Sequence, residues 1–474
     1  MSCDKSVQTC EEDIITAVSE TDCESGSESS IVPFYDRMNE TDQSDLVECI
    51  YELIYEYIEI YVLKMAKPDF HIEIVDDICH VIYQQLTETC EDIEYEDMHA
   101  FVSHYCNIWF TTREDYSCPI RDEPHYMTNA IAEEYGLDEP DVKNIIGSRI
   151  ANLREKDAAN PKQRTKEWYE RRYNMMTASN IWQTLGSDAQ KNRFIYDKCK
   201  PLSLDIVESK WMSTDGSLHW GVKYEPLTVM VYEWLTGARV ELFGCISHHQ
   251  YPFLGASPDG VVVNPESPLY GRLVEIKNIY NRDMDGIPSE AYWIQIQAQI
   301  ACCDLDFCDF VETRFKEYES EADYINGLEE DACVDADKKF KGVILHMVPR
   351  DGRSNIPLYQ YMPLDISDYL GWIEETKQSM SETHVTYKII YWYLDDIQMT
   401  TISRNDRWFN AAVSAFQEIW ETIQRERISG YEHRAPKKRV PVEVITVATE
   451  SDVPIAPCGN ICVIKLSEEE ALSD

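Results

Sequence analysis

The sequence predicts an α/β fold, in which a mixed β-sheet is flanked by helices and an all-helical region precedes it. From about residue 178 to 427, segments in which apolar and polar residues alternate, as in strands, are interspersed with segments of helical periodicity. This pattern is typical of an α/β core. Residues 46–153 show helical spacing of apolar residues only. At 474 residues the chain is longer than one hydrophobic core usually supports, so more than one ordered part is expected.

The first 155 residues divide into two parts. Residues 1–44 are acidic and rich in serine, and we expect them to form a disordered tail without a signal peptide. Residues 45–155 are expected to be a helical region, with helices at 46–64, 72–86, 98–110, 128–135 and 141–153. Four glutamates interrupt the most hydrophobic segment, 46–63, at helical spacing, which indicates an amphipathic helix rather than a membrane span. This region could cover the core, bind a partner protein, mimic DNA with its acidic face, or be a structural extension.

Residues 160–430 are expected to form the core. Helices are predicted at 178–185, up to residue 235, at 291–302 and at 406–427. Strands are predicted at 240–247, 260–263, 272–278, 307–317 and 341–347, with further candidates at 358–362 and 385–393. Residues 431–474 are expected to be a flexible tail.

The sixteen cysteines do not indicate a zinc site or a disulfide framework. No Cys-x-x-Cys occurs, and His248-His249, Cys79-His80 and the His104-x-Cys106 pair each lack a second ligand pair at finger spacing. Reduced thiols in an intracellular chain are therefore the expectation.

One short pattern in the core suggests chemistry. Asp259 is followed by a turn-rich stretch, 264–268, between two apolar runs, and then by Glu275-Ile276-Lys277. This arrangement predicts a hairpin that brings Asp259 beside Glu275. Because side chains alternate along a strand, Glu275 and Lys277 share one face while their neighbours enter the core.

Two carboxylates at the end of a sheet suit Mg²⁺, which prefers oxygen ligands. Such an ion polarises a phosphodiester and lowers the pKa of a bound water, and Lys277 would orient that water and offset developing negative charge. Taken alone, the triplet Asp259, Glu275 and Lys277 is common by chance, and a solvated surface hairpin would be the preferred interpretation of it.

Further motifs surround this triplet in a fixed order. The segment 168–179 carries a Trp, then Arg172, then a Thr-Ala-Ser that opens a helix. Gly221 and Glu225 form a Gly-x-x-x-Glu, and residues 292–297 read Tyr-x-x-Gln-x-Gln. In this order the motifs resemble the lambda-exonuclease family of PD-(D/E)XK nucleases, which includes YqaJ-like viral recombinases and viral alkaline exonucleases. The resemblance covers roughly residues 160–430 and departs from the family at Asn174, where many members carry Gly.

The resemblance implies a restriction-endonuclease-like fold and a two-metal Mg²⁺ site in which Mn²⁺ could substitute. It places Asp259, Glu275 and the carbonyl of Ile276 on the metal ions, makes Glu225 a support of the second ion, and makes Lys277 the catalytic lysine. It also implies a pocket for a 5′-phosphate. That pocket would be built from Arg172, Thr177, Ser179, Ser257 and one glutamine of the pair Gln295 and Gln297, with Gln297 favoured.

These residue types suit a phosphate, because arginine binds it bidentately and hydroxyls near a helix N-terminus add donors. Simpler structural roles stay open as well, since Thr177 and Ser179 could only cap the helix that follows them. The glutamines could form a polar helix face. Residues two apart on a helix diverge by about 200°, so Gln295, Gln297 and Gln299 cannot all point the same way.

The function expected from the resemblance is a metal-dependent 5′-to-3′ exonuclease that digests linear double-stranded DNA in viral-type recombination or genome processing. Its partners would be DNA ends and a single-strand annealing protein, with no membrane. Two alternatives remain: an endonuclease or RNA-degrading enzyme on the same core, and a non-catalytic interaction protein. The presence of Asp259, Glu275 and Lys277 argues against the latter.

Charge is distributed unevenly. The net charge of −43 opposes DNA binding in general, because phosphate contacts normally come from lysine and arginine. Residues 1–150 hold 8 Lys and Arg against 35 Asp and Glu, whereas residues 162–200 hold 9 against 4. The basic stretch thus coincides with the expected phosphate pocket.

The tail carries two short signals. Residues 434–440 resemble a basic nuclear-import signal and would place the protein in a host nucleus, although a basic linker or DNA-binding edge is an equal alternative. Residues 463–470 resemble a SUMO-interacting motif, in which an apolar strand adds to a sheet edge, and imply SUMO or a sumoylated partner. A plain disordered tail is the alternative there.

Overall fold

The computed structural model describes residues 35, 38–87, 93–111, 139–163, 165–202, 214, 216–326, 334–335, 338–352, 354 and 356–435. The chain divides into two units, Met1–Arg434 and Ala435–Asp474. All elements discussed below belong to the first unit. The SUMO-interacting signal and all but the first two residues of the basic run lie outside the described residues, as does the helix expected at 128–135.

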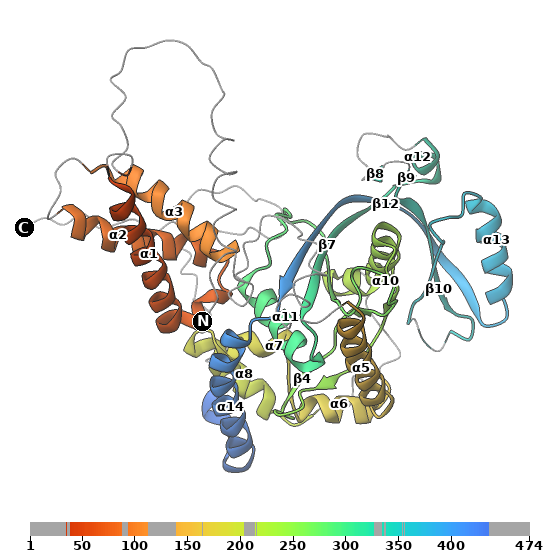
Figure 1. Cartoon of the computed structure of the whole chain (residues 1–474). Helices are drawn as coiled ribbons and strands as arrows, with labels where there is room; N and C mark the ends of the chain where they lie inside the picture. Colours follow the sequence, from red (N-terminus) through yellow and green to blue (C-terminus); the bar gives the residue numbers. More distant parts are fainter. Residues whose placement is uncertain are drawn as a thin grey trace, which may run out of the picture. The chain divides into compact units, whose positions relative to one another are not determined.

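The N-terminal region is helical, as predicted (Figure 1). It contains α1 (Glu40–Tyr61), the short 3-10 helix η2 (Val62–Ala66), α2 (Phe70–Thr87) and α3 (Tyr95–Thr111). The Asn39 side chain caps α1 by accepting a bond from Asp42 N. Apolar residues at helical spacing, among them Ile50, Ile54 and Ile74, are fully buried where these helices pack. None of the described helices has the length and apolar character that crossing a bilayer would require.

These helices share a hydrophobic core with the rest of the first unit. The cluster that contains Ile50 and Ile74 continues through Trp293 to Trp408 and Phe416. The indole N–H of Trp408 donates to the carbonyl of Leu63 at 3.4 Å. The helical region is therefore packed onto α14 (Asp406–Ser429) through apolar contact.

The central sheet has seven strands in the order β11-β10-β12-β7-β6-β5-β2. In chain order these are β2 (Val240–Glu241), β5 (Gly260–Val262), β6 (Leu273–Asn278), β7 (Phe307–Glu317), β10 (Lys341–Pro349), β11 (Leu358–Tyr361) and β12 (His384–Ser403). Within it β6 and β7 run parallel, and the other neighbours are antiparallel. The mixed sheet with flanking helices confirms the predicted α/β fold class.

A second sheet has three strands in the order β1-β4-β3, formed by β1 (Met176–Thr177), β4 (Leu254–Ala256) and β3 (Ile246–Ser247). A two-stranded ladder joins β8 (Val334–Asp335) to β9 (Lys338–Lys339). The second sheet is small, but it brings the segment around residue 176 beside the segment that leads to Asp259.

The remaining helices surround the sheets (Figure 1). They are α5 (Glu139–Ala158), α6 (Lys166–Tyr173), α7 (Ala178–Ile181) with η4 (Trp182–Thr184), α8 (Asp188–Cys199), α10 (Ser217–Thr236), α11 (Glu290–Cys303), α12 (Glu321–Asn326), α13 (Tyr369–Met380) and η5 (Glu432–Arg434). Of these, α11 is the most enclosed, since every residue from Trp293 to Cys303 is buried.

Two strand predictions were wrong in extent. The single strand expected at 240–247 is split into β2 and β3, which belong to different sheets. The chain turns at Gly244, whose N–H donates to Asp157 Oδ1 at 2.7 Å and whose missing Cβ leaves room for that carboxylate. The strand expected at 385–393 continues to Ser403 as β12, with a bulge between Leu394 and Asp396.

Candidate active site

The hairpin of β5 and β6 holds the two carboxylates that the sequence singles out. The strands pair antiparallel with Gly260 opposite Val274, so Asp259 and Glu275 lie next to each other at the end of the hairpin. Asp259 Oδ2 accepts a 2.7 Å bond from the backbone N–H of Ile276. Val274 and Ile276 are buried on the other side of the strand. The alternation of β6 therefore fixes which side chains face the site.

Glu275 is buried, with 2% of its surface exposed. Its Oε1 accepts bonds from Lys277 Nζ and from Gln295 Nε2, the latter at 2.6 Å. Its Oε2 accepts a 2.6 Å bond from Gln299 Nε2. Both oxygens of this buried carboxylate thus accept hydrogen bonds from neighbouring side chains.

Lys277 projects from the same face of β6 as Glu275 and is mostly buried. Its Nζ lies 4.7 Å from the centre of the Tyr292 ring, in cation–π geometry. Burial acts to lower the pKa of Lys277, but the carboxylates of Glu275 and Asp259 outweigh it and raise the pKa above the ordinary value. Lys277 is accordingly a cation in this environment.

Asp259 and Glu225 complete a group of carboxylates. Burial raises the pKa of Asp259 well above its usual range, and the negative charges of Glu275 and of Glu225 on α10 raise it further. Like charges that are gathered in a partly buried place destabilise one another unless a cation compensates them. Within the group, Lys277 is the cation that partly offsets this charge and lowers the pKa of Asp259.

Asn278, the last residue of β6, joins this strand to α10. Its Oδ1 accepts bonds from Thr228 at 2.7 Å and from Thr313 at 2.8 Å, and its Nδ2 donates to the carbonyl of Gly221 at 3.3 Å. These contacts set the position of the helix that carries Glu225. Sequence reasoning missed Asn278, although its place directly after Glu-Ile-Lys on a strand end could have suggested a role.

The second sheet brings the Arg172 segment to the same region. β1 and β4 pair in parallel with Thr177 beside Gly255, two residues before Ser257. Arg172 Nη1 lies 3.5 Å from Ser257 Oγ, and its guanidinium stacks 4.7 Å from the centre of the Trp168 ring. Arg172 thus reaches the loop that ends at Asp259.

Thr177 and Ser179 stand at the start of α7. Their hydroxyl oxygens are 3.5 Å apart; Thr177 is buried and Ser179 is exposed. Thr177 occupies the N-cap position, but its side chain makes no capping hydrogen bond. Simple capping, the structural alternative for this hydroxyl, therefore does not account for it.

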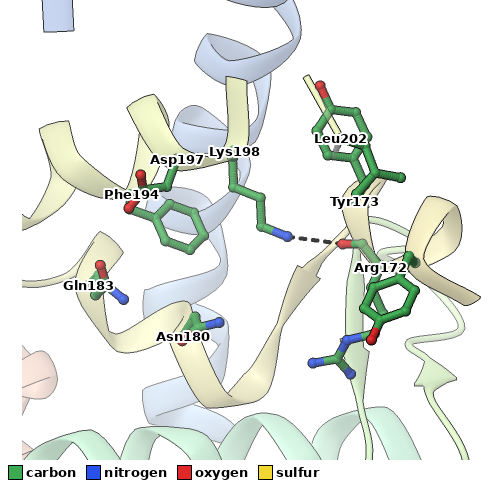
Figure 2. Close-up of a pocket in the computed structure, with 9 residues that line it drawn as sticks. Arg172, Tyr173, Asn180, Gln183, Phe194, Asp197, Lys198 and Leu202 are labelled. Atoms are coloured by element: carbon green, nitrogen blue, oxygen red, sulfur yellow. Dashed lines mark hydrogen bonds between the residues drawn. The ribbon is translucent and has the colours of Figure 1, made fainter. Parts of the chain in front are cut away.

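A cleft of about 340 Å³ adjoins Arg172 (Figure 2). Lys198 lines it and donates to the carbonyl of Arg172 at 3.0 Å and to that of Met175 at 2.6 Å. Burial, then the charges of Arg172 and Arg427, lower the pKa of Lys198 to about 8. Arg427 in turn donates to the carbonyl of Tyr173 at 2.8 Å. Two cations from α8 and α14 therefore hold the backbone between Arg172 and Thr177.

The glutamines of α11 divide between two sides of the helix. Gln295 and Gln299 face Glu275, whereas Gln297 donates to the carbonyl of Ser403 at 2.8 Å and accepts from Asn405 N at 2.8 Å. Gln297, the glutamine favoured for the phosphate pocket, is instead turned toward the start of α14. The cause is the rotation of about 200° between residues two apart. Gln299, which sequence reasoning left out, is the second amide on Glu275.

The donors around Glu275 fit a hard divalent cation by their chemistry. Asp259, Glu275, Glu225 and the Ile276 carbonyl supply only oxygen, which Mg²⁺ and Mn²⁺ prefer over nitrogen and sulfur donors. Gln299 Oε1 is buried nearby without a hydrogen-bond partner. As they stand, no three His, Cys, Asp or Glu side chains within the described residues form a ready-made metal cluster. Binding an ion would require Lys277 to release part of its contact with Glu275.

Comparison with known families agrees with this geometry. Residues 167–306, which contain Arg172, Glu225, Asp259 and Glu275, match the family model of the YqaJ-like viral recombinase domain. This segment is therefore similar to a YqaJ-like viral recombinase domain. The matched segment runs from α6 to the end of α11 and so includes the strands of both sheets that carry site residues. The family suspected from the order of the motifs is thereby confirmed for these residues.

One curated relative shows a distant similarity to this chain. Over 299 residues, 55% of this chain and 52% of the relative, the chain is 26% identical to an uncharacterised protein of Acanthamoeba polyphaga mimivirus. The match thus spans about half the length of that curated relative. The relative's name states no activity, so it adds the extent of similarity and nothing about chemistry.

Solved structures give weak similarities. The alkaline exonuclease LHK-Exo of Laribacter hongkongensis, in complex with dAMP, is 18% identical with a TM-score of 0.32, covering 56% of this chain and 94% of that one. A phage related exonuclease of Haemophilus somnus is 13% identical with a TM-score of 0.29, covering 53% and 96%. TM-scores this low do not establish a common fold, so the fold of the YqaJ-like domain rests on its own strands and helices.

Proposed function

We propose that the protein is a metal-dependent nuclease that digests linear double-stranded DNA from 5′-phosphorylated ends. The observation that carries this proposal is the convergence of Asp259, Glu275 and Lys277 on one hairpin, beside Arg172 and Ser257. A YqaJ-like viral recombinase domain over 167–306 supports it. The finer parts of the proposal, namely duplex DNA, 5′-to-3′ polarity and Mg²⁺, follow from the resemblance and the chemistry of the donors.

The carboxylates would hold the divalent metal. Asp259, Glu275 and the Ile276 carbonyl would bind one ion, and Glu225 would support a second. When bound, the metal would polarise the scissile phosphodiester and lower the pKa of a water. Gln295 and Gln299 keep both oxygens of Glu275 oriented, and the Ile276 N–H keeps Asp259 turned toward it.

Lys277 would act on the attacking water and on the charge that develops at phosphorus. Its Nζ is a compact cation with three donors, held near Glu275 and over the Tyr292 ring. A cation fixed beside the reacting phosphate stabilises the transition state more than the ground state, since negative charge accumulates there. Lys277 is therefore the proposed catalytic residue among the cations of the site.

Arg172 would select the DNA end. Its guanidinium is already oriented by Trp168 and by Ser257, and the backbone around it is held by Lys198. A planar guanidinium with neighbouring hydroxyls from Thr177, Ser179 and Ser257 suits a terminal phosphate. A pocket that accepts a free phosphate end, but not a continuous backbone, would make the enzyme an exonuclease.

The test compares end structures and variants in one assay. Purified protein with Mg²⁺ is given linear duplex DNA with 5′-phosphate or 5′-hydroxyl ends, and closed circular duplex. We expect mononucleotide release that is faster from phosphorylated ends, and loss of about 10²–10³-fold or more in Lys277→Ala. Arg172→Gln should lose most of the preference for the phosphate, whereas Arg193→Gln, a matched loss of one charge from an exposed arginine, should keep it.

Different outcomes would reject the proposal in distinct ways. Nicking of closed circles without end preference would indicate an endonuclease, and faster degradation of RNA would indicate an RNA-degrading enzyme. If none of the substrates is cleaved, a non-catalytic interaction protein would be favoured.

The partners and the localisation are proposals that rest on the sequence. A single-strand annealing protein would use the strand that such an exonuclease leaves. Arg434, the first residue of the proposed nuclear-import run, is engaged: it donates to Glu426 Oε1 at 2.6 Å and to Asn192 Oδ1 at 3.0 Å. A nuclear-import signal would therefore depend on the cations that follow it, and alanines at Lys437 and Lys438 would test it by relocating a fluorescent fusion.

A further inference from the structure

A second cleft, of about 440 Å³, lies beside the N-terminal part of α10. Its walls come from six parts of the chain: the start of α10, the chain after β6, the end of β7, and strands β10, β11 and β12. Most of its lining is aromatic or cationic. The residues used below are Trp220, Lys223, Tyr280, His346, Tyr387 and Lys388.

Aromatic rings at the cleft are exposed to an unusual degree. Tyr280 is 62% exposed and Tyr387 is 71% exposed. Tyr280 stands edge-on to Trp220 with ring centres 5.0 Å apart, and Tyr387 lies against His346 at 4.9 Å. Exposed aromatic faces that are supported from behind by other rings are suitable platforms for stacking a planar ligand.

The cleft is positive in a strongly negative chain. Lys223 and Lys388 both pair with Glu317, and the Lys388–Glu317 distance is 3.1 Å. Two lysines against one carboxylate leave a net positive charge. His346 adds no charge, since burial and then the neighbouring cationic groups lower its pKa to about 4. An anionic ligand is therefore attracted here, whereas the chain carries −43 in total.

Two buried polar atoms in the cleft lack a partner. Trp220 Nε1 and His346 Nε2 are enclosed and make no hydrogen bond to any described residue. His346 is 5% exposed, so the cost of leaving its ring nitrogen unsatisfied is not relieved by solvent. An indole N–H is a donor and a neutral imidazole nitrogen is a donor or an acceptor, so a polar ligand edge that reached them would satisfy both.

Two segments of the chain carry residues of both the cleft and the candidate active site. On α10, Trp220 and Lys223 precede Glu225 by five and two residues, which is about 7.5 Å and 3 Å along the helix axis. Tyr280 follows Lys277 by three residues, at most about 10 Å along the chain. These spans equal roughly one to three base steps of 3.4 Å.

We propose that this cleft binds nucleotides of a single DNA strand next to the scissile position, by stacking bases on Tyr280 and Tyr387 and attracting the backbone with Lys223 and Lys388. The proposal rests on the proposed nuclease function, since it assigns the neighbouring groove to the same substrate. Its role would be to hold the strand that has been separated from the duplex, so that the metal site acts on an unpaired nucleotide.

Binding without catalysis tests it. A fluorescent oligothymidylate is titrated, in EDTA, with the full-length wild type, with Tyr280→Ala, with Tyr387→Ala and with the double variant. Tyr61→Ala removes an exposed tyrosine of α1 outside the cleft and is the matched control. We expect about tenfold weaker binding for each cleft variant, the usual effect of losing one stacking ring, and no change for the control.

Photocrosslinking adds a readout that misfolding cannot imitate. With 5-iododeoxyuridine in the oligonucleotide, the wild type should crosslink at Tyr280, Tyr387 or Trp220. Unchanged affinity in the double variant, crosslinks confined to other surfaces, or no binding of the oligothymidylate would each overturn the proposal.

The same proteins are assayed on duplex DNA with Mg²⁺, which separates the two proposals. If the wild type cleaves DNA and the cleft variants bind and cut as well as it does, the proposal for the cleft is rejected and the nuclease function stands. If the wild type binds the oligonucleotide through the cleft but cuts no DNA, the nuclease function is rejected and the cleft remains a binding site for a single strand.

Discussion

Gln299 donates a 2.6 Å hydrogen bond to Oε2 of Glu275. One helical turn away on α11, Gln295 donates to the other oxygen at the same distance. A buried carboxylate held by two amides and a lysine cannot rotate without breaking a charge-assisted bond. The order of Gln295 and Gln299 on the helix therefore sets the orientation of the carboxylate on the neighbouring strand.

Removing one of these amides should affect catalysis more than binding. In Gln299→Leu, we expect kcat to fall about tenfold or more with KM little changed, because Glu275 loses one of the bonds that orient it. Steady-state kinetics on linear duplex DNA provide the measurement. Gln297→Leu is the control: its amide bonds to Ser403 and Asn405, so this change should lower stability but leave activity per folded molecule and the 5′-phosphate preference intact. A loss of that preference would restore Gln297 to the phosphate pocket.

Gly255 should not tolerate a side chain. A Cβ at this position would lie 2.5 Å from Met175 Sδ and 3.1 Å from Cys245 Sγ, in the ladder that joins β1 to β4. Gly255→Ala should destabilise the protein by about 1–3 kcal/mol, as overpacking does. Urea unfolding measures this. If the cause is steric, adding Met175→Ala should recover part of the loss; a double variant as unstable as the sum of the two single ones would argue for another cause.

A buried ion pair should be costly to break. Arg272 Nη1 lies 2.8 Å from Asp309 Oδ1, and both side chains are 8% exposed. Arg272→Leu leaves a buried carboxylate unpaired and should lower the free energy of unfolding by about 3–5 kcal/mol. Arg154→Leu breaks an exposed pair with Glu241 and should cost about 1 kcal/mol or less. Equal losses for the two variants in denaturant titrations would show that burial does not decide the difference.

Lys198 should make stability depend on alkaline pH. Its pKa is lowered to about 8 in the folded protein from 10.5. Between these values the unfolded chain holds a proton that the folded protein has released, so the free energy of unfolding contributed by this group rises with pH. Across the window the rise is at most about 3 kcal/mol.

The measurement compares the wild type with Lys198→Met. The difference in unfolding free energy between them should move in favour of the wild type from pH 8 upward, because the remaining titrating groups are common to both proteins. A difference that is flat across this range, or that falls, would contradict the lowered pKa.

The fold class could be predicted from the sequence because the patterns that indicate it are local. Alternation in 272–278 and the turn-rich stretch before it are properties of neighbouring residues, and they locate β6, β5 and their hairpin. The split of 240–247 was not predictable in the same way, because it depends on Asp157, a residue far away in the chain that receives the Gly244 N–H.

The candidate site shows the same limit. The motifs placed Asp259, Glu275, Lys277 and Arg172, but the side of α11 that faces Glu275 depends on how that helix packs against β6. Helical geometry alone showed that Gln295 and Gln297 must diverge. It could not show that Gln295 and Gln299 would face the carboxylate while Gln297 anchors the start of α14.

The most direct test of a metal centre at Glu275 is hydrolysis of linear 5′-phosphorylated duplex DNA by the wild type and by Glu275→Gln while Mg²⁺ is titrated, with folding of both proteins checked by thermal unfolding. We predict that the wild-type rate rises from zero in EDTA to saturation with Mg²⁺. Glu275→Gln, equally folded, should remain at least about 10²-fold slower at every Mg²⁺ concentration. Wild-type cleavage that persists in EDTA, or a Glu275→Gln variant that cuts as fast as the wild type, would contradict a metal-dependent nuclease centred on this carboxylate.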